Sequence, residues 1–175
     1  MIIQVDITKD MLEEAEHMTA ENKAMFGIGG THRKDVKRQK LTGFLAEVAI
    51  NRSFPDLSYS DKLAVDFKYK GYTFDSKAQG CNSKPLNYYN ATLYEEQKKR
   101  DTDFYIFNRV KNDSSCVWIC GIISKQRFFN IAKLKKAGTK CNNFTYNQSR
   151  YEIQYEDLTD LREALNLLKS NKTEE

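Results

Sequence analysis

The chain contains few of the residues that mark specialised protein classes. Its 175 residues include only 2 Pro, 8 Gly and 4 Cys. Such small numbers of proline and glycine exclude a collagen-like or low-complexity chain, and four cysteines are too few for a disulfide scaffold at this length. We therefore expect a reduced, cytoplasmic location.

Long apolar runs and an export signal are also missing. No stretch approaches the roughly 18 apolar residues that cross a membrane, so we expect no membrane association. The N-terminal segment MIIQVDITKDMLEE becomes acidic where a signal peptide would continue apolar. Apolar residues make up 40% of the chain and charged residues 30%. This composition predicts a single domain over residues 1–170 with its own core, followed by a disordered tail at 171–175.

Basic side chains are concentrated in two places, although the net charge is only +4. One run holds Arg33, Lys34, Lys37, Arg38 and Lys40, and a second holds Lys98, Lys99 and Arg100. Basic clusters on an otherwise balanced chain are typical of contact with a phosphate backbone, but a solvated helix face has the same composition. The candidate nucleic-acid-binding residues are Arg33, Lys34, Lys37, Arg38 and, in the loop NSKPLNYYN at residues 82–90, Lys84.

Hydrophobic periodicity predicts a mixed α/β domain with a central β-sheet flanked by helices. The strands at residues 103–110 and 116–123 are nearly continuous in apolar residues, so they should lie at the centre of the sheet. The other expected strands are a hairpin at 63–69 and 72–79, and a late strand at 151–155. The expected helices are 8–25, 34–52, 91–99, 124–136 and 157–169.

The hairpin carries the most informative polar residues of the chain. If Lys70-Gly71 forms a two-residue turn, Asp66 lies directly opposite Asp75, with β-carbons about 4.5–5.5 Å apart. Side chains alternate along a strand, so Lys77 and Gln79 share the face of these aspartates. Opposed carboxylates repel one another unless a cation compensates them, and Mg²⁺ prefers carboxylate oxygens. The register therefore indicates a metal site, with a solvated hairpin face on which Lys77 neutralises Asp75 as the alternative.

These residues resemble a known enzyme family. The stretch from Val65-Asp66 to Asp75-Ser76-Lys77, preceded by a helix that carries Glu47, resembles the PD-(D/E)XK nuclease superfamily. That superfamily includes restriction-endonuclease-like enzymes, Holliday-junction resolvases and phage nucleases. The resemblance covers roughly residues 40 to 125, in the order helix, hairpin, strand, strand, helix. It implies a restriction-endonuclease-like fold, although Val65 stands where the motif's name has proline.

The resemblance also implies roles for individual residues. Asp66 and Asp75 would hold a catalytic Mg²⁺, for which Mn²⁺ can substitute, and Glu47 would be the acidic residue that many members supply from the preceding helix. Lys77 would orient or activate the attacking water, or stabilise the pentacovalent phosphate. Gln79 resembles a glutamine that some members carry at this point. The predicted catalytic set is therefore Glu47, Asp66, Asp75, Lys77 and Gln79.

Two further observations bear on this assignment. A literal Pro55-Asp56 occurs upstream, so Asp56 or Asp61 is an alternative to Asp66 as the first aspartate. In addition, Gly43 precedes Glu47 by one helical turn, and a glycine inside a helix costs about 1 kcal/mol relative to alanine. We interpret Gly43 as a position where the missing side chain lets the sheet and a metal approach Glu47, with a tolerated glycine beside an exposed glutamate as the alternative.

The sequence thus predicts a Mg²⁺-dependent nuclease that hydrolyses DNA phosphodiesters, and we expect it to act as an endonuclease, which cuts within a strand. Its partner would be duplex or branched DNA, and a homodimer is possible because many relatives are dimers. The alternatives are a non-catalytic nucleic-acid-binding or protein-interaction module on the same fold, and a metal-dependent RNase.

Overall fold

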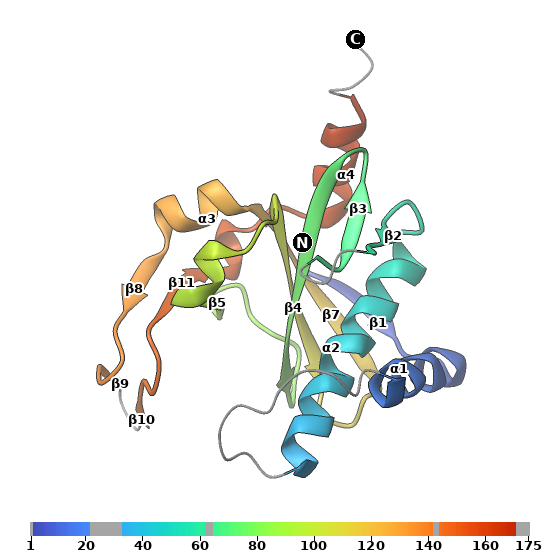
Figure 1. Cartoon of the computed structure of the whole chain (residues 1–175), viewed down its shortest axis with the longest axis horizontal. Coiled ribbons are helices and arrows are strands. Elements are labelled where there is room, and N and C mark those ends of the chain that lie inside the picture. The colour runs from blue at the N-terminus through green and yellow to red at the C-terminus, as the bar shows by residue number, and fades with distance from the viewer. Residues whose placement is uncertain (1, 22–32, 62–64, 142–143, 171–175) are drawn as a thin grey trace.

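A six-stranded mixed sheet forms the centre of an α/β structure (Figure 1). The computed structural model describes residues 2–21, 33–61, 65–141 and 144–170, with the backbone alone at 33–35. The helices are α1 (Lys9–Glu21), α2 (Arg33–Ser53), α3 (Lys125–Ile131) and α4 (Leu161–Ser170), with 3-10 turns η1 (Glu95–Lys99) and η2 (Tyr155–Asp157). The strands are β1 (Ile3–Asp6), β2 (Ser58–Tyr59), β3 (Phe67–Tyr69), β4 (Tyr72–Cys81), β5 (Asn90–Tyr94), β6 (Phe104–Lys111), β7 (Cys116–Ser124), β8 (Lys133–Lys135), β9 (Lys140–Cys141), β10 (Phe144–Thr145) and β11 (Arg150–Gln154).

The strand order of the central sheet is β1-β7-β6-β4-β3-β2. Strands β4 and β6 are parallel, and the other neighbouring pairs are antiparallel. The expected mixed sheet is thus confirmed, with β6 and β7 in its interior, where their continuous apolar sequences are buried. A separate three-stranded sheet has the order β5-β11-β8.

Each face of the central sheet is covered by its own hydrophobic cluster. On one face, α1, α2 and α4 pack against side chains such as Phe74 and Ile106. On the other face, β5, β11 and α3 pack against Tyr105 and Phe107, and Phe128 of α3 is fully buried. Figure 1 shows α1 and α2 on one side of the sheet and the smaller sheet with α3 on the other. Strand β4, which belongs to the central sheet, therefore lies between these two layers.

The expected helix at residues 91–99 is wrong. The chain forms strand β5 followed by the short turn η1, because Ala91 and Leu93 alternate with polar residues and are buried in the second cluster. The antiparallel pairing of β5 with β11 satisfies the backbone hydrogen-bonding groups of β5. Because this pairing is with a distant segment, local propensity did not predict the strand. This strand carries one wall of the candidate site described below.

Three other boundaries differ from the sequence expectation. Ser124 caps α3 as expected by accepting a hydrogen bond from the Arg127 N–H, but the helix ends at Ile131 because β8 pairs with β11. Helix α4 begins at Leu161, after the turn η2, and not at residue 157. Strand β1 was not predicted, since its four residues are too few for a clear pattern. The expected end of the first helix near residue 25 and the tail at 171–175 lie outside the described residues.

Candidate active site

The hairpin turn has the predicted geometry. Lys70 and Gly71 both have positive φ, 48° and 82°, which is the backbone that matches the twist of a two-residue hairpin. The resulting register pairs Tyr69 with Tyr72 and Phe67 with Phe74, as the sequence predicted. Strand β3 pairs with β4 only as far as Phe74, so the remaining residues of β4, from Asp75 to Cys81, have no β3 partner on that edge. The polar residues of β4 therefore lie at an open edge of the sheet.

The expected strand at 63–69 is too long: β3 begins at Phe67, so Asp66 precedes the ladder and is not paired with Asp75 in it. The side chain of Asp66 occupies the open edge of β4. Its backbone N–H donates to the Phe74 carbonyl at 3.0 Å, and its Oδ2 accepts a hydrogen bond from the Ser76 N–H at 2.6 Å. The carboxylate thus takes the acceptor position that a longer β3 would have supplied. This contact fixes Asp66 beside Asp75, close enough for the charge of Asp75 to raise the pKa of Asp66.

Asp75 is the most deeply buried carboxylate of the site, with a side chain only 2% exposed. Its Oδ1 accepts a hydrogen bond from Lys77 Nζ at 2.6 Å. Its Oδ2 is buried and has no hydrogen-bond partner among the described residues, and Arg100 Nη1 lies 3.8 Å away. Lys77 is itself mostly buried, at 18% exposure, whereas Arg100 is 40% exposed. One buried carboxylate thus faces two cations and keeps an oxygen unsatisfied.

Glu47 reaches this cluster from α2. Its neighbours Ala46 and Val48 are completely buried, so the helix is held firmly against the sheet while Glu47 itself is half-buried. Burial raises the pKa of Glu47 to about 9, with further contributions from the negative charges of Asp66 and Asp75 and an opposing one from Lys77. The glutamate therefore lies within electrostatic reach of every other charged member of the predicted catalytic set.

The carboxyl groups of this cluster repel one another. The pKa of Asp66 is raised to about 7, first by burial and then by the charge of Asp75, while the Ser76 N–H and Lys77 act in the opposite direction. Together with the raised pKa of Glu47, this means that the site holds protons near neutral pH that ordinary carboxyl groups would release. A bound cation would remove the same repulsion.

The donor chemistry of the cluster fits a hard divalent cation. Carboxylate oxygens are the preferred ligands of Mg²⁺ and Mn²⁺, and the unsatisfied Asp75 Oδ2 is such an oxygen. As the described side chains stand, they contain no group of three or more His, Cys, Asp or Glu residues arranged to hold a metal ion. In the structure, Lys77 is bonded to Oδ1 of Asp75 and the Ser76 N–H to Oδ2 of Asp66, so the other oxygen of each carboxylate is the one that a metal ion would bind.

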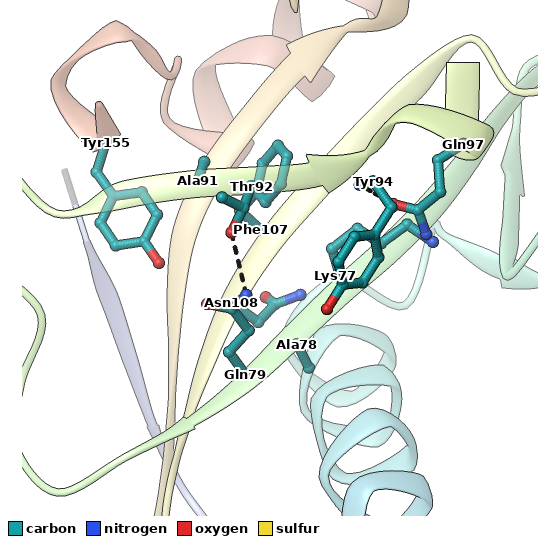
Figure 2. Close-up of a pocket in the computed structure, with 10 residues that line it drawn as sticks. All are labelled: Lys77, Ala78, Gln79, Ala91, Thr92, Tyr94, Gln97, Phe107, Asn108 and Tyr155. Carbon is teal, nitrogen blue, oxygen red and sulfur yellow. Dashed lines mark hydrogen bonds between the residues drawn. The ribbon is translucent and has the colours of Figure 1, made fainter. Parts of the chain in front are cut away.

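Gln79 lies farther along the same face of β4 and borders a cavity. Its Nε2 donates to Thr92 Oγ1 on β5 at 3.1 Å, and the side chain is exposed. The cavity has a volume of about 190 Å³ and lies between β4 and the segment formed by β5 and η1 (Figure 2). Its lining residues are Lys77, Ala78, Gln79, Ala91, Thr92, Tyr94, Gln97, Phe107, Asn108 and Tyr155. Lys77 therefore belongs both to the charged cluster and to the cavity wall.

A second, wider hollow continues from the cavity along α2. It has a volume of about 550 Å³ and is bordered by Arg38 and Thr42 of α2, by Gln79 and by Tyr94. Lys37 is exposed on the same helix, and Lys84 is exposed in the loop between β4 and β5. The side chains of Arg33 and Lys34 lie outside the described residues. Among the predicted nucleic-acid-binding residues whose side chains the structure describes, Arg38 borders this hollow, which shares Gln79 and Tyr94 with the cavity beside Lys77.

The structure places the two alternative aspartates away from the cluster. Asp56 is exposed in the turn that follows α2, and Asp61 is exposed and forms an ion pair with Lys68. Neither of them is among the charges that shift the pKa of Glu47 or Asp66. The geometry therefore brings together Glu47, Asp66, Asp75 and Lys77, and it does so without a contribution from the literal Pro55-Asp56.

The interpretation of Gly43 as a point of close approach is wrong. A Cβ atom built at this position would have no atom within 4 Å outside the backbone of its own helical turns. Open space therefore adjoins Gly43, and the sheet does not approach α2 there.

Two residues of the site were missed as site residues in the sequence. Arg100 belongs to a basic run that was noted, but its position beside Asp75 depends on how η1 joins β6. Tyr94 lies in the segment for which the sequence predicts a helix, and the signal that points to it is the alternation of buried and exposed residues along β5. Tyr94 borders both hollows described above.

Comparison with known proteins gives no family assignment. The chain matches no protein-family model and resembles no curated protein. Within the described part of the chain, no helix has the length and apolar character needed to span a membrane.

Proposed function

We propose that this protein is a metal-dependent deoxyribonuclease with its active site at the open edge of β4. The observation that carries the proposal is the cluster of Glu47, Asp66 and Asp75 around Lys77, with a buried Asp75 oxygen that lacks a hydrogen bond. Buried like charges destabilise a fold, so a site that retains them is a candidate for function. The order helix, hairpin and central strands agrees with the resemblance to PD-(D/E)XK nucleases, and we extend the proposal to a restriction-endonuclease-like fold.

Glu47, Asp66 and Asp75 would hold Mg²⁺ or Mn²⁺. When bound, such a cation lowers the pKa of a coordinated water and offsets the negative charge of a phosphodiester. Asp66 is oriented for this role by the Ser76 N–H, which leaves its second oxygen for another partner. Asp75 Oδ2 is buried, has no hydrogen bond among the described residues and lies 3.8 Å from Arg100 Nη1, so a cation bound there would leave the Lys77 contact through Oδ1 intact.

Lys77 and Arg100 would contact the phosphate that reacts. Both cations already lie beside the buried Asp75 carboxylate, at 2.6 and 3.8 Å. Once the charge of Asp75 is compensated by another cation, their positive charge becomes available to the negative charge that develops on the phosphate. Arg100 is the more exposed of the two and would meet an entering strand first, while the more buried Lys77 would act at the carboxylates.

The hollow along α2 gives the strand a path to these residues. Arg38 and Gln79 both border it, and Gln79 also lines the smaller cavity to which Lys77 belongs. Exposed Lys37 adds positive charge on the same helix. A strand that follows this path would have phosphate contacts on α2 and its scissile phosphate beside Lys77.

A non-catalytic nucleic-acid-binding module is the second candidate. The observation that favours it is the short Lys77–Asp75 ion pair, which neutralises the buried carboxylate without any metal. A binding module would use the same basic residues and the same hollow, but it would have no requirement for the Asp75 charge.

The test is cleavage of a supercoiled DNA circle with Mg²⁺ or Mn²⁺, compared with EDTA. Wild type should nick or linearise the circle, and Asp75→Asn and Lys77→Ala should each lose at least about 100-fold in rate, since general acid–base and electrostatic contributions are typically of that size or larger. Asp56→Asn is the matched control and should cleave normally, because Asp56 is exposed and remote from the cluster. Metal-independent binding without cleavage would support the binding module. A preference for an RNA substrate of the same sequence would identify an RNase.

A further inference from the structure

The cavity next to Lys77 has the dimensions and lining of a site for one ring system. Its volume of about 190 Å³ is smaller than the roughly 300–1,000 Å³ of pockets for drug-sized ligands. Ala91 and Phe107 supply apolar surface, and both are buried. Flat apolar surface combined with polar groups at the rim suits a planar heterocycle better than a flexible chain.

Of the residues that line this cavity, Tyr94 is the one best placed to stack on a planar ligand. It is the last residue of β5, is 44% exposed, and borders three adjoining hollows. Arg150 on β11 pairs with Tyr94 in the sheet, and its guanidinium lies 5.8 Å from the ring centroid. Arg150 also lies 4.4 Å from the ring centroid of Tyr146. The Tyr94 ring is thus supported by the smaller sheet while it remains accessible from the hollows.

The polar groups of the cavity match the edge of a nucleobase. The Gln97 side-chain carbonyl accepts from the Tyr94 N–H at 3.3 Å, so its amide NH₂ is the group that can donate to a ligand. The Gln79 NH₂ donates to Thr92, so its carbonyl can accept. Asn108 also lines the cavity, but its Oδ1 is buried and its Nδ2 donates to Ser76 Oγ at 3.0 Å, so Gln79 and Gln97 are the amide side chains available to a ligand. Figure 2 shows Tyr94 and Gln97 on one side of the cavity and Gln79 with Asn108 on the other.

We infer that this cavity receives one unpaired nucleobase, which stacks on Tyr94 next to the phosphate bound at Lys77. The inference rests on the proposed function, because it uses Lys77 as the phosphate contact that the cavity adjoins. A base inside a duplex is stacked and paired, so it must leave the helix before it can enter a cavity of this kind. The substrate class is therefore DNA with an unpaired nucleotide beside the cleaved bond, such as a single strand or an unpaired flap, in preference to a fully paired duplex.

The test measures stacking without cleavage. In EDTA, the fluorescence of 2-aminopurine in a single-stranded DNA 12-mer should fall when wild-type protein binds, and Tyr94→Phe should behave in the same way. Tyr94→Leu should weaken binding by about 5- to 150-fold, which corresponds to the 1–3 kcal/mol that base–aromatic stacking contributes. Tyr88→Leu is the matched control, since Tyr88 is 61% exposed and does not line the cavity. Its binding should equal that of wild type.

An abasic nucleotide tests the same contact from the DNA side and needs no variant. A 12-mer with one abasic position should bind less tightly only when that position is the one whose 2-aminopurine signal changes. Equal binding by wild type and Tyr94→Leu, or by intact and abasic strands, would overturn the inference. If wild type cleaves DNA with Mg²⁺ but Tyr94→Leu binds DNA as wild type does, the inference fails and the proposed function stands. If the Tyr94-dependent signal is present and no DNA or RNA is cleaved, the proposed function fails and the base-binding site stands.

Discussion

At the scale of single residues, the carboxyl groups of Glu47, Asp66 and Asp75 repel one another, which costs stability, and the same groups would bind a cation. Asp66 would be an ordinary edge residue if β3 were longer, but it caps the Ser76 N–H and therefore lies against Asp75. Two cations, Lys77 and Arg100, offset part of the repulsion. The remaining repulsion is visible in the raised pKa values of Glu47 and Asp66, and it makes the site responsive to protons and to metal ions.

The raised pKa values predict an unusual dependence of stability on pH. In EDTA, the unfolded chain releases the protons of Glu47 and Asp66 above about pH 4 to 5, whereas the folded protein keeps them until about pH 9 and 7. Between these limits the folded state binds more protons, so this contribution to the free energy of unfolding is full at low pH and falls as pH rises. Thermal melting at pH 5.5 and 8.5 should therefore show a smaller drop for the double variant Glu47→Gln/Asp66→Asn than for wild type.

The control for this pH effect is the double variant Glu16→Gln/Asp56→Asn, which alters two exposed carboxylates by the same charge. Its melting temperatures should follow wild type at both pH values. A double variant of the cluster that melts with an unchanged pH dependence would show that Glu47 and Asp66 titrate normally in the folded protein.

The position of Asp66 also predicts which aspartate responds to metal. At a Mn²⁺ concentration a hundred times the dissociation constant, wild type should gain about 2.7 kcal/mol in the free energy of unfolding. Asp66→Asn should lose most of this gain and should be more stable than wild type without metal, because the repulsion with Asp75 is removed. Thermal melting with and without Mn²⁺ measures both effects. Asp56→Asn should keep the full metal response, and the reverse result would assign the site to Pro55-Asp56.

At the scale of the secondary-structure elements, α2 and the β3–β4 hairpin together define the site. Helix α2 brings Glu47 to the cluster and, about two and a half turns earlier along the chain, Arg38 to the hollow. The hairpin ends its pairing at Phe74 and so leaves the following residues of β4 accessible. The same helix can thus serve the carboxylates at one point and a phosphate backbone at another.

The role of α2 predicts the salt dependence of DNA binding. If Lys37 and Arg38 each contact a phosphate, Lys37→Gln/Arg38→Gln should bind all DNA sequences less tightly. The slope of log affinity against log salt should then flatten by roughly 0.9 per lost contact on duplex DNA, or roughly 0.7 on a single strand. The charge-matched control Lys9→Gln/Arg162→Gln changes exposed residues of α1 and α4 and should leave the slope unaltered. An unchanged slope in the α2 variant would identify Lys37 and Arg38 as a solvated helix face.

At the scale of the whole molecule, the central sheet connects the two hydrophobic clusters and the C-terminal segment. Ile122 of β7 exchanges two backbone hydrogen bonds with Thr159, both 2.9 Å long, and α4 begins directly after this bridge. The contact requires Gly121, which has a φ of +141°. A Cβ atom there would lie 2.7 Å from the Thr159 carbonyl oxygen and 2.8 Å from the Leu158 Cβ.

This close approach predicts opposite effects for two glycine substitutions. Gly121→Ala should lower the free energy of unfolding by at least about 1–3 kcal/mol, because the segment before α4 must move away from the sheet. Gly43→Ala, in the open space beside α2, should raise it by up to about 1 kcal/mol, since alanine is the better helix former. Chemical denaturation of both variants measures the two changes. Similar values for both would mean that the bridge at Thr159 does not hold the C-terminal segment in place.

The sequence by itself determined the local parts of this protein. Lys70-Gly71 specified a two-residue turn, and that turn set the register that brings Asp66 toward Asp75, since pairing in a short hairpin follows directly from its turn. The continuous apolar runs placed β6 and β7 inside the sheet, and the 3.6-residue period located α2. Each of these features depends on neighbours in the chain, so a local pattern contains the information.

Only the tertiary structure decided how distant segments meet. It made residues 90–94 a strand, because pairing with β11 and burial against Phe107 outweighed local propensity. That pairing placed Tyr94 over the cavity, and the junction of η1 with β6 placed Arg100 beside Asp75. The pKa of Glu47 was likewise set by burial and by carboxylates from another element. These properties arise from contacts between segments far apart in the chain, and a local sequence pattern does not encode which segments will share a space.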